Sequence, residues 1–329
     1  MTLLWGPLSD RVGRQPAILA SLLAFTILTA ATGLVDSAEA FIVMRLVTAI
    51  DASGVVPIAL ALIGDTFPFH RRGHALGWLF GGMAGGIAVG STVGAIAEPY
   101  LGWPGLFIVA AAGGLALFTL ALTAPTLPRV HRFTAPAPLR KIAADYLALL
   151  RSRRGLRTYS YVFINAMLHS GVYTWLGLYL QQRFNLGPVG IGLVLLGYGI
   201  PGFLLGPVIG RVVDRVGRAR IIPAGVALGA ACALVLATPF PVVGAALTIT
   251  ALSLGYDMTQ PPLGGIDTDL PGNRGQAMAL NVFTLFTGFG LGSLAFQALL
   301  PAGFAITLSL FGLAALLAAL AAIPLFRAE

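Results

Sequence analysis

The sequence predicts an all-α membrane protein built from two similar helix bundles. Its 329 residues are 57% hydrophobic and only 10% charged, with a mean hydropathy of +0.89. A soluble domain carries roughly 25% charged residues, so this chain has too few charged residues to cover the surface of a soluble protein. Two further observations support the prediction: apolar runs recur along the chain, and the string Asp-Arg-Val-Gly-Arg at 10–14 returns unchanged at 214–218.

The apolar runs predict about ten complete crossings, since a transmembrane helix needs about 20 apolar residues. They lie at roughly 16–34, 40–63, 75–98, 104–123, 158–181, 188–209, 220–238, 240–262, 276–298 and 302–325. Residues 1–8 are too few to cross and read as the end of a helix whose beginning is absent. A basic, proline-containing segment at 124–157 separates the two groups of runs.

The basic residues predict the orientation of the chain. Apart from Arg45 and Arg183, the Lys and Arg residues lie in alternate connections between the apolar runs, in the 124–157 segment or near the C-terminal end. Because basic loops stay cytoplasmic, both repeated turns and the 124–157 segment are expected on the cytoplasmic side. We therefore expect a multi-pass membrane protein with both repeated turns on the same side.

The repeat also predicts the domain organisation. A second pair of similar loops, at 65–75 and 267–277, has an offset of 202 residues, close to the 204 of the first pair. Such parallel repeats are typical of transporters. We expect an N-terminal bundle at 1–123, a cytoplasmic linker at 124–157 and a C-terminal bundle at 158–329. By the same offset, about 50 residues of a six-plus-six parent would precede Met1, so the N-terminal bundle is expected to be incomplete, through a shortened chain, a misassigned start or a natural deletion.

The string from Gly6 to Arg14 resembles the loop between helices 2 and 3 that marks the major facilitator superfamily. The resemblance implies that family's fold and secondary active transport by alternating access. It also implies that the two loops latch the cytoplasmic side closed in one state; the alternative is that they only set topology. The residues of these latch motifs are Gly6, Asp10, Arg11, Gly13 and Arg14, with Gly210, Asp214, Arg215, Gly217 and Arg218 in the second half.

Two further motifs resemble the proton-coupled exporters of this superfamily. Arg45 matches the arginine of the helix-4 motif, although Thr48 and Ala49 replace the residues that usually follow it. Asp51 is either a proton carrier or a structural counter-ion. Glycines at four-residue spacing share one helix face, which allows close helix approach or forms a static packing seam. These glycines are Gly82, Gly86, Gly90 and Gly94.

Polar residues in the second half predict a central cavity. Thr250, Ser253, Asp257 and Gln260 fall on one face of a helix, which would be unfavourable against lipid and so faces the bundle interior. The Pro261-Pro262 pair is expected to break this helix just beyond. Asn165, His169 and Tyr173 form a second stripe at four-residue spacing, and Asn281 is a weaker candidate. With Arg45 and Asp51, these residues are the expected contacts of substrate or proton, except that a lone membrane histidine is more often a packing residue.

No catalytic grouping, metal-ligand spacing or nucleotide-binding loop is found in the sequence, so we expect no enzyme activity, cofactor or metal. The net charge of +8 is explained by lipid contacts and topology rather than by nucleic-acid binding. The expected function is proton-coupled efflux of small organic molecules by a monomer in a lipid bilayer. The alternatives are a sugar or metabolite uptake permease and a truncated remnant that does not transport.

Overall fold

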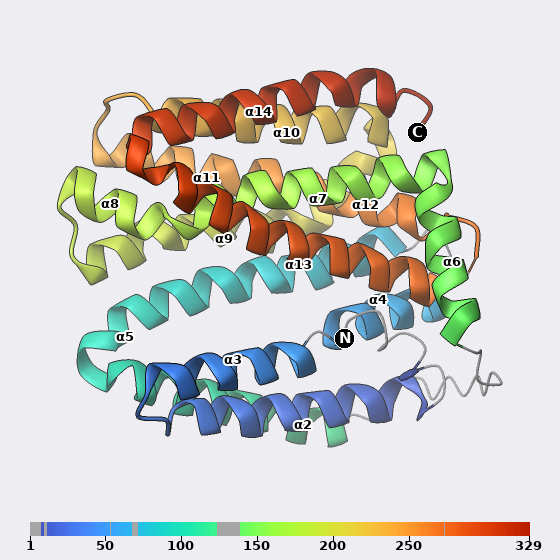
Figure 1. Ribbon diagram of the computed structural model, residues 1–329, viewed down its shortest axis with the longest axis horizontal. Coiled ribbons are helices and arrows are strands. Elements are labelled where there is room, and N and C mark those ends of the chain that lie inside the picture. The colour runs from blue at the N-terminus through green and yellow to red at the C-terminus, as the bar shows by residue number, and fades with distance from the viewer. Residues whose placement is uncertain (1–7, 10–11, 53, 68–71, 124–138, 273) are drawn as a thin grey trace. The chain divides into compact units, whose positions relative to one another are not determined.

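The computed structural model describes residues 8–9, 12–52, 54–67, 72–123, 139–272 and 274–329 (Figure 1). Within these ranges the secondary structure is helical and contains no strand. The helices are α2 (Arg14–Thr32), α3 (Ala38–Ala52), α4 (Val55–Thr66), α5 (Arg72–Thr123), α6 (Leu139–Arg151), α7 (Arg153–Thr174), α8 (Leu176–Phe184), α9 (Pro188–Val216), α10 (Arg218–Leu236), α11 (Val242–Asp257), α12 (Gln260–Asp267), α13 (Arg274–Leu299), the 3-10 turn η2 (Leu300–Ala302) and α14 (Phe304–Leu325).

These helices confirm the predicted all-α membrane architecture. In the described ranges, eight helical segments are long and apolar enough to cross a membrane. The longest, Ala75–Thr123, contains Gly102 in a non-helical conformation with φ of 64°, which separates the predicted spans 75–98 and 104–123. The predicted span 158–181 corresponds to α7 and α8. It is not among the eight membrane-spanning segments, because its arginines and polar side chains lower its mean hydropathy.

The chain forms two compact units, each described here by itself. The first unit comprises Met1–Pro68, Ala97–Arg151 and Leu270–Phe283, and the second comprises Phe69–Ile96, Ser152–Asp269 and Thr284–Glu329. The division into bundles at 1–123 and 158–329 with a linker at 124–157 stays a prediction.

In the first unit, α2 packs against α3 and α4. Aromatic rings join α3 to the second half of α5: the ring of Phe41 meets those of Trp103 and Phe107 edge-on, at centroid distances of 5.5 and 5.7 Å. Gly114 of α5 lies against Thr26 of α2, since a Cβ at this glycine would come within 2.6 Å of the threonine Oγ1. These contacts hold α5 beside α2 and α3 in this unit.

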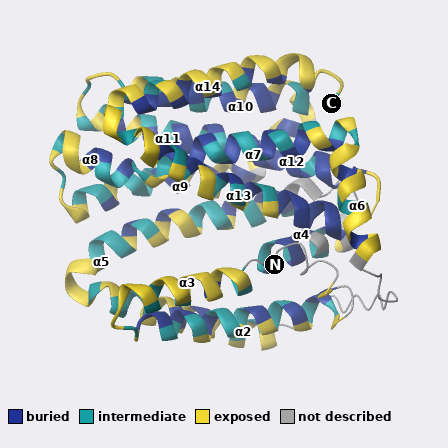
Figure 2. Ribbon diagram, in the orientation of Figure 1, coloured by how far each residue is buried: buried dark blue, intermediate teal, exposed yellow. Residues whose placement is uncertain are grey.

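In the second unit, α10 packs against α14 and α11, and α11 packs against α9 (Figure 1). The core between these helices is apolar and includes the fully buried Leu236, Ile249 and Phe296. α14 alternates between buried and exposed residues, whereas α10 is buried along much of its length (Figure 2). The exposed side of α14 carries leucines such as Leu313 and Leu317, as expected of a helix that faces lipid.

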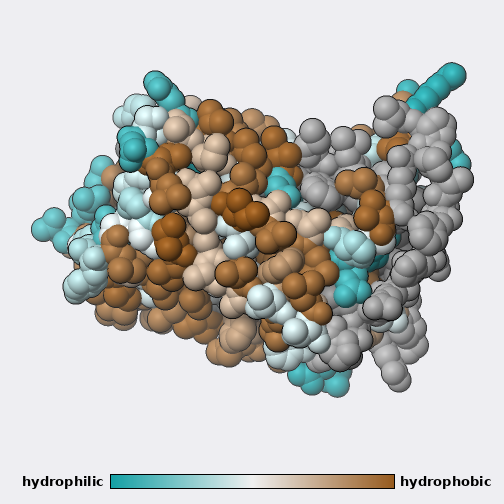
Figure 3. All heavy atoms as spheres, turned by 90° about the horizontal axis from the view of Figure 1, so that it is seen from below, coloured by the Kyte–Doolittle hydropathy of each residue, from teal (hydrophilic) through white to brown (hydrophobic). Residues whose placement is uncertain are grey.

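The outer surface is correspondingly apolar. In the face shown in Figure 3, hydrophobic residues cover most of the part that the structure describes. Large hydrophobic side chains are exposed on helices of both units, among them Ile27, Leu120, Leu204 and Leu247. A surface of this kind is unfavourable in water and favourable in a bilayer.

The two repeated turns share one backbone geometry. Gly13 and Gly217 each precede a helix, with φ/ψ of 98°/148° and 90°/149°. Each glycine donates its backbone N–H to the carbonyl four residues earlier, on Ser9 and Val213, at 3.0 Å. Only glycine adopts this positive φ without strain, so the same sequence at both sites produces the same turn.

Of the remaining latch residues, Arg14 is buried and donates a hydrogen bond to the hydroxyl of Ser9. Gly210 is buried and Arg215 is exposed. Gly6, Asp10 and Arg11 lie outside the described residues. The latch role of both motifs, including that of Asp214 and Arg218, stays a prediction.

Candidate functional site

A cavity of about 310 Å³ lies within the second unit. It brings together five residues that the sequence analysis expected to face a cavity: His169 and Tyr173 from α7, Ser253 and Asp257 from α11, and Gln260 from α12. The first half of α5, α9 and the second half of α13 complete the wall. Their contributions are Gly77, Phe80, Gly81, Met83, Ala84 and Ile87; Tyr198, Gly202 and Gly206; and Leu285 and Phe289.

The polar residues of the predicted span 240–262 lie on two helices rather than on one. The helix breaks within the stripe rather than just beyond it: α11 ends at Asp257 and α12 begins at Gln260. Pro261 and Pro262 occupy the first turn of α12, where a missing N–H costs nothing. The break places Asp257 at the end of one helix and Gln260 at the start of the next, with both lining the cavity.

Among the described residues, the carboxylate of Asp257 has one hydrogen-bond donor, and the facing helix leaves room for it. The hydroxyl of Ser253, one turn earlier, donates to Oδ2 at 3.0 Å. On the facing helix α9, a Cβ added to Gly202 would lie 2.6 Å from the same oxygen. The absence of a side chain at Gly202 therefore leaves room for the carboxylate.

An aromatic cluster surrounds His169. Its ring stacks on Tyr256 with a centroid distance of 3.8 Å and an interplanar angle of 19°. The hydroxyl of Tyr198 shares a hydrogen bond with Nε2 of His169, and the ring of Tyr198 stacks on Tyr173 at 4.0 Å. Sequence reasoning missed Tyr198, although a tyrosine within an otherwise apolar span is a detectable signal.

Asn165 supports the helix break. Its Nδ2 donates to the hydroxyl of Thr259 at 2.6 Å, and Thr259 is the residue that precedes α12. Asn165 lines a smaller cavity of about 30 Å³ together with His169 and Tyr256, which line both cavities. Asn165 therefore ties α7 to the segment that positions Asp257 and Gln260.

Three other predicted cavity residues belong to the first unit. The guanidinium of Arg45 lies 5.4 Å from the centre of the Phe107 ring, a cation–π distance. The hydroxyl of Ser21 donates to Oδ1 of Asp51 at 3.5 Å, while Oδ2 of Asp51 is buried without a hydrogen-bond partner among the described residues. Asn281 is buried. Their participation in a common cavity stays a prediction.

The close approach of α5 and α9 uses a helix face that the sequence analysis did not select. A Cβ on Gly81 would lie 3.0 Å from the carbonyl oxygen of Gly202, and one on Gly206 would lie 2.8 Å from that of Gly77. At Gly199, an added Cβ would come within 2.3 Å of both the Ala84 oxygen and the Ala88 Cβ.

The glycines at four-residue spacing are not part of this contact. A Cβ at Gly82, Gly86, Gly90 or Gly94 would meet no atom of the described residues within 4 Å. The proposed role of this face, as a close helix contact or a static packing seam, stays a prediction.

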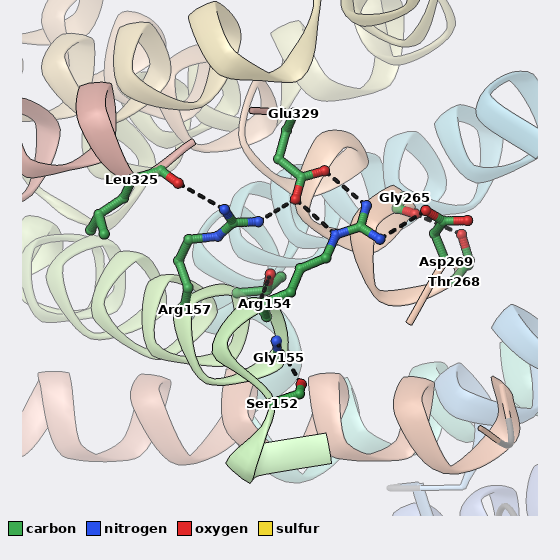
Figure 4. A network of polar contacts seen from close by, with 10 residues as sticks. Ser152, Arg154, Gly155, Arg157, Gly265, Thr268, Asp269, Leu325 and Glu329 are labelled. Atoms are coloured by element: carbon green, nitrogen blue, oxygen red, sulfur yellow. Dashed lines mark hydrogen bonds and ion pairs between the residues drawn. The ribbon is translucent and has the colours of Figure 1, made fainter. Parts of the chain in front are cut away.

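A second polar cluster lies at the start of α7 (Figure 4). Arg154 donates from Nε and Nη2 to the two carboxylate oxygens of Glu329, each at 2.8 Å, and from Nη1 to Asp269 at 2.9 Å. Arg157 donates to Glu329 and to the backbone carbonyl of Leu325, the latter at 2.7 Å. The hydrogen bonds from Arg154 and Arg157 hold the pKa of Glu329 below its usual value, although burial acts in the opposite direction.

We expect Glu329→Gln to lower the apparent melting temperature in detergent by an amount that depends on pH. Hydrogen bonds to charged groups contribute about 1.5–3 kcal/mol to stability, and the exposure of Arg154 to solvent reduces this contribution. We therefore expect Glu329→Gln to lower the free energy of unfolding by about 1–2 kcal/mol at neutral pH. Because the folded-state pKa of Glu329 is lowered, its contribution is fully present above the unfolded-state pKa of about 4.3. It is lost as the pH falls through the folded-state pKa.

The measurement is the difference in melting temperature between wild type and Glu329→Gln from pH 7 to below pH 4. Glu98→Gln, at an exposed carboxyl, serves as the control and is expected to change little at any pH. A difference between wild type and Glu329→Gln that stays constant over this range would contradict the proposed ion pairing.

Among the described residues, no three His, Cys, Asp or Glu side chains come together as metal ligands would. The cavity instead offers one carboxylate, one imidazole, hydroxyl groups and aromatic rings within a mostly apolar wall. Such a site suits reversible binding of a small organic molecule.

Comparisons with known proteins agree with this description. The chain is 28% identical over 246 residues to the MFS-type transporter YwfA of Bacillus subtilis, covering 75% of this chain and 59% of that protein. It is 31% identical over 230 residues to the multidrug resistance protein MdtG of Erwinia billingiae, covering 67% and 54%. The chain thus spans between about half and three fifths of the length of these relatives.

The fold is also found in a solved structure, that of the human organic anion transporter MFSD10 (TETRAN). The two share a TM-score of 0.77 at 20% sequence identity, over 98% of this chain and 80% of that one. The family model of the Major Facilitator Superfamily matches residues 1–293. This match confirms the resemblance carried by the repeated turns: the chain belongs to the Major Facilitator Superfamily of membrane transporters.

Proposed function

We propose that this chain carries out proton-coupled export of small organic molecules by alternating access. The observation that supports this most strongly is the placement of Asp257: a carboxylate with a single hydroxyl donor in the wall of a mostly apolar, aromatic cavity. Relatives whose names describe drug resistance add support, among them MdtG and the chloramphenicol resistance protein of Pseudomonas aeruginosa.

The proposed mechanism uses Asp257 as the proton acceptor. Protonation removes its charge, which changes the relative free energies of the outward- and inward-open states. The two bundles then rock about the cavity, and the repeated turns at 10–14 and 214–218 act as latches on the cytoplasmic side. Asp51, whose Oδ2 is buried without a partner among the described residues, is the second candidate for the proton site.

The cavity wall favours an apolar or aromatic molecule over a sugar. A sugar has hydroxyl groups all around its ring, and each would need a hydrogen-bond partner once buried. Here the wall is mostly apolar, and the Tyr198 hydroxyl is already bonded to His169. We therefore place export of organic molecules above sugar uptake, in a monomer of the bacterial inner membrane.

The test is flux in vesicles that contain the purified chain. With an imposed pH gradient, we expect addition of a transported organic compound to increase proton movement above that of protein-free vesicles. In intact cells, dissipating the proton gradient is expected to raise accumulation of that compound; lower accumulation would indicate uptake instead. Absence of flux from this chain, with flux restored when it is extended upstream to the length of its relatives, would identify a truncated remnant.

A further inference from the structure

Helix α6 presents three different sides, two of which are apolar. Ile142 and Leu149, seven residues apart, are buried and face the protein. At about 100° per residue, Leu150 and Leu147 lie about 80° and 140° round the helix from Ile142. These two leucines are 37% and 45% exposed, and most of the helix around them is exposed as well (Figure 2). They form an apolar flank beside the buried side of α6.

The third side of α6 is basic. Arg140 and Arg151 lie about 160° and 180° from Ile142, next to the apolar flank, and Lys141 lies beyond them. All three basic side chains are exposed, and none forms a hydrogen bond or ion pair with a described residue. Asp145 is the only acidic residue of α6, so the helix carries two more positive charges than negative ones.

The arginines that follow α6 in the sequence differ in this respect. Arg154 and Arg157, in the first turns of α7, are both paired with the carboxylate of Glu329. The positive charges at the start of α7 therefore have an anion within the protein. Those of α6 are available to an anion outside the described part of the chain.

The apolar flank and the basic side have opposite requirements. Exposed leucines are unfavourable in water, and unpaired basic groups are unfavourable in hydrocarbon. Both are satisfied at a membrane surface, where leucines enter the edge of the acyl chains and the long basic side chains reach the headgroups. The 124–157 segment, which contains α6, is expected on the cytoplasmic side, and the cytoplasmic leaflet carries anionic lipids.

We propose that α6 lies in the membrane surface and binds the phosphate groups of anionic phospholipids through Arg140, Lys141 and Arg151, with Leu147 and Leu150 in the lipid. Charge complementarity selects this partner. A phosphatidylcholine headgroup also carries a phosphate, but its ammonium group cancels the charge. The inference is independent of the proposed export function, since α6 does not line the cavity in the second unit.

The experiment places α6 relative to the lipid, with the full chain in vesicles. The native Cys232, which is buried, is replaced by alanine. Leu147→Cys and Ala148→Cys are then labelled separately with an environment-sensitive fluorophore, and brominated lipid chains serve as the quencher. Ala148 is the matched control because it is exposed but lies about 100° further round the helix. In vesicles of phosphatidylcholine and phosphatidylglycerol, we expect quenching at least about threefold stronger at position 147 than at 148.

The lipid charge and the basic side chains should both affect this quenching. Each basic residue near an anionic surface strengthens the attraction roughly fivefold, so we expect quenching at position 147 to fall at least about twofold in phosphatidylcholine alone. The triple variant Arg140→Gln/Lys141→Gln/Arg151→Gln should cause a similar fall in the mixed vesicles. The control Arg220→Gln/Arg327→Gln changes two exposed arginines outside α6 and should cause none.

Equal quenching at positions 147 and 148 in the mixed vesicles would overturn the inference, because α6 would then not be embedded in the membrane surface. Quenching at position 147 that persists unchanged in phosphatidylcholine alone or in the triple variant would also overturn it, because the anionic headgroups would then not be bound. The melting temperature of the triple variant in detergent should match that of wild type, which separates loss of lipid binding from misfolding.

Discussion

Asp257→Asn is expected to reduce proton-linked flux to the level of protein-free vesicles. Asparagine has nearly the same shape as aspartate and still offers an oxygen to the Ser253 hydroxyl, which donates at 3.0 Å in the wild type. The cavity and the α11–α12 break should therefore persist. What the variant loses is the ability to take up and release a proton, so coupling is lost without loss of the fold.

The measurement is substrate-dependent proton flux across a range of external pH, with Glu39→Gln as the exposed carboxyl control. The melting temperature of Asp257→Asn in detergent should stay near that of wild type, which separates loss of coupling from misfolding. The parallel variant Asp51→Asn tests the second candidate. Flux that survives in Asp257→Asn and disappears in Asp51→Asn would transfer the proton site to Asp51.

Much of the fold and part of this site could be predicted from the sequence. Helix positions follow from hydropathy, because each crossing must satisfy its backbone hydrogen bonds internally. The repeated string gave matching turns, since Gly13 and Gly217 have the same positive-φ geometry. The polar stripes at 165–173 and 253–260 identified five cavity residues, because polar groups inside a membrane protein avoid lipid.

What the sequence did not reveal depends on contacts between helices. Pro261 and Pro262 were expected to end a helix, but they begin one, and the choice is made by tertiary contacts such as that of Asn165 with Thr259. Tyr198 lies in an apolar run, and its role emerges only from its hydrogen bond to His169 on another helix. A pattern within one helix cannot specify the partner across the interface.

The contact between α5 and α9 shows the same limit, because a pattern within one helix does not reveal which glycines meet the other. A substitution in this contact has the second large expected effect. Gly199→Ala is expected to lower the free energy of unfolding by about 1–3 kcal/mol, the usual range for overpacking. The new Cβ would lie 2.3 Å from both the Ala84 carbonyl oxygen and the Ala88 Cβ, and neither is the end of a flexible side chain. To accept the methyl group, α5 and α9 must move apart, which also displaces Gly202 from its contact with the Asp257 carboxylate.

The matched control is Gly86→Ala, the same substitution on a helix face where the added Cβ meets no atom within 4 Å. Alanine favours helix over glycine by about 0.8–1.0 kcal/mol, so Gly86→Ala should melt at or slightly above the wild-type temperature. Gly290→Ala, on the exposed part of α13, should behave likewise. Melting temperatures in detergent give the comparison, and equal destabilisation by Gly199→Ala and Gly86→Ala would show that the packed face of α5 has been assigned incorrectly. Because only Gly199→Ala is expected to displace α9 from Asp257, only that variant should also reduce proton-linked flux.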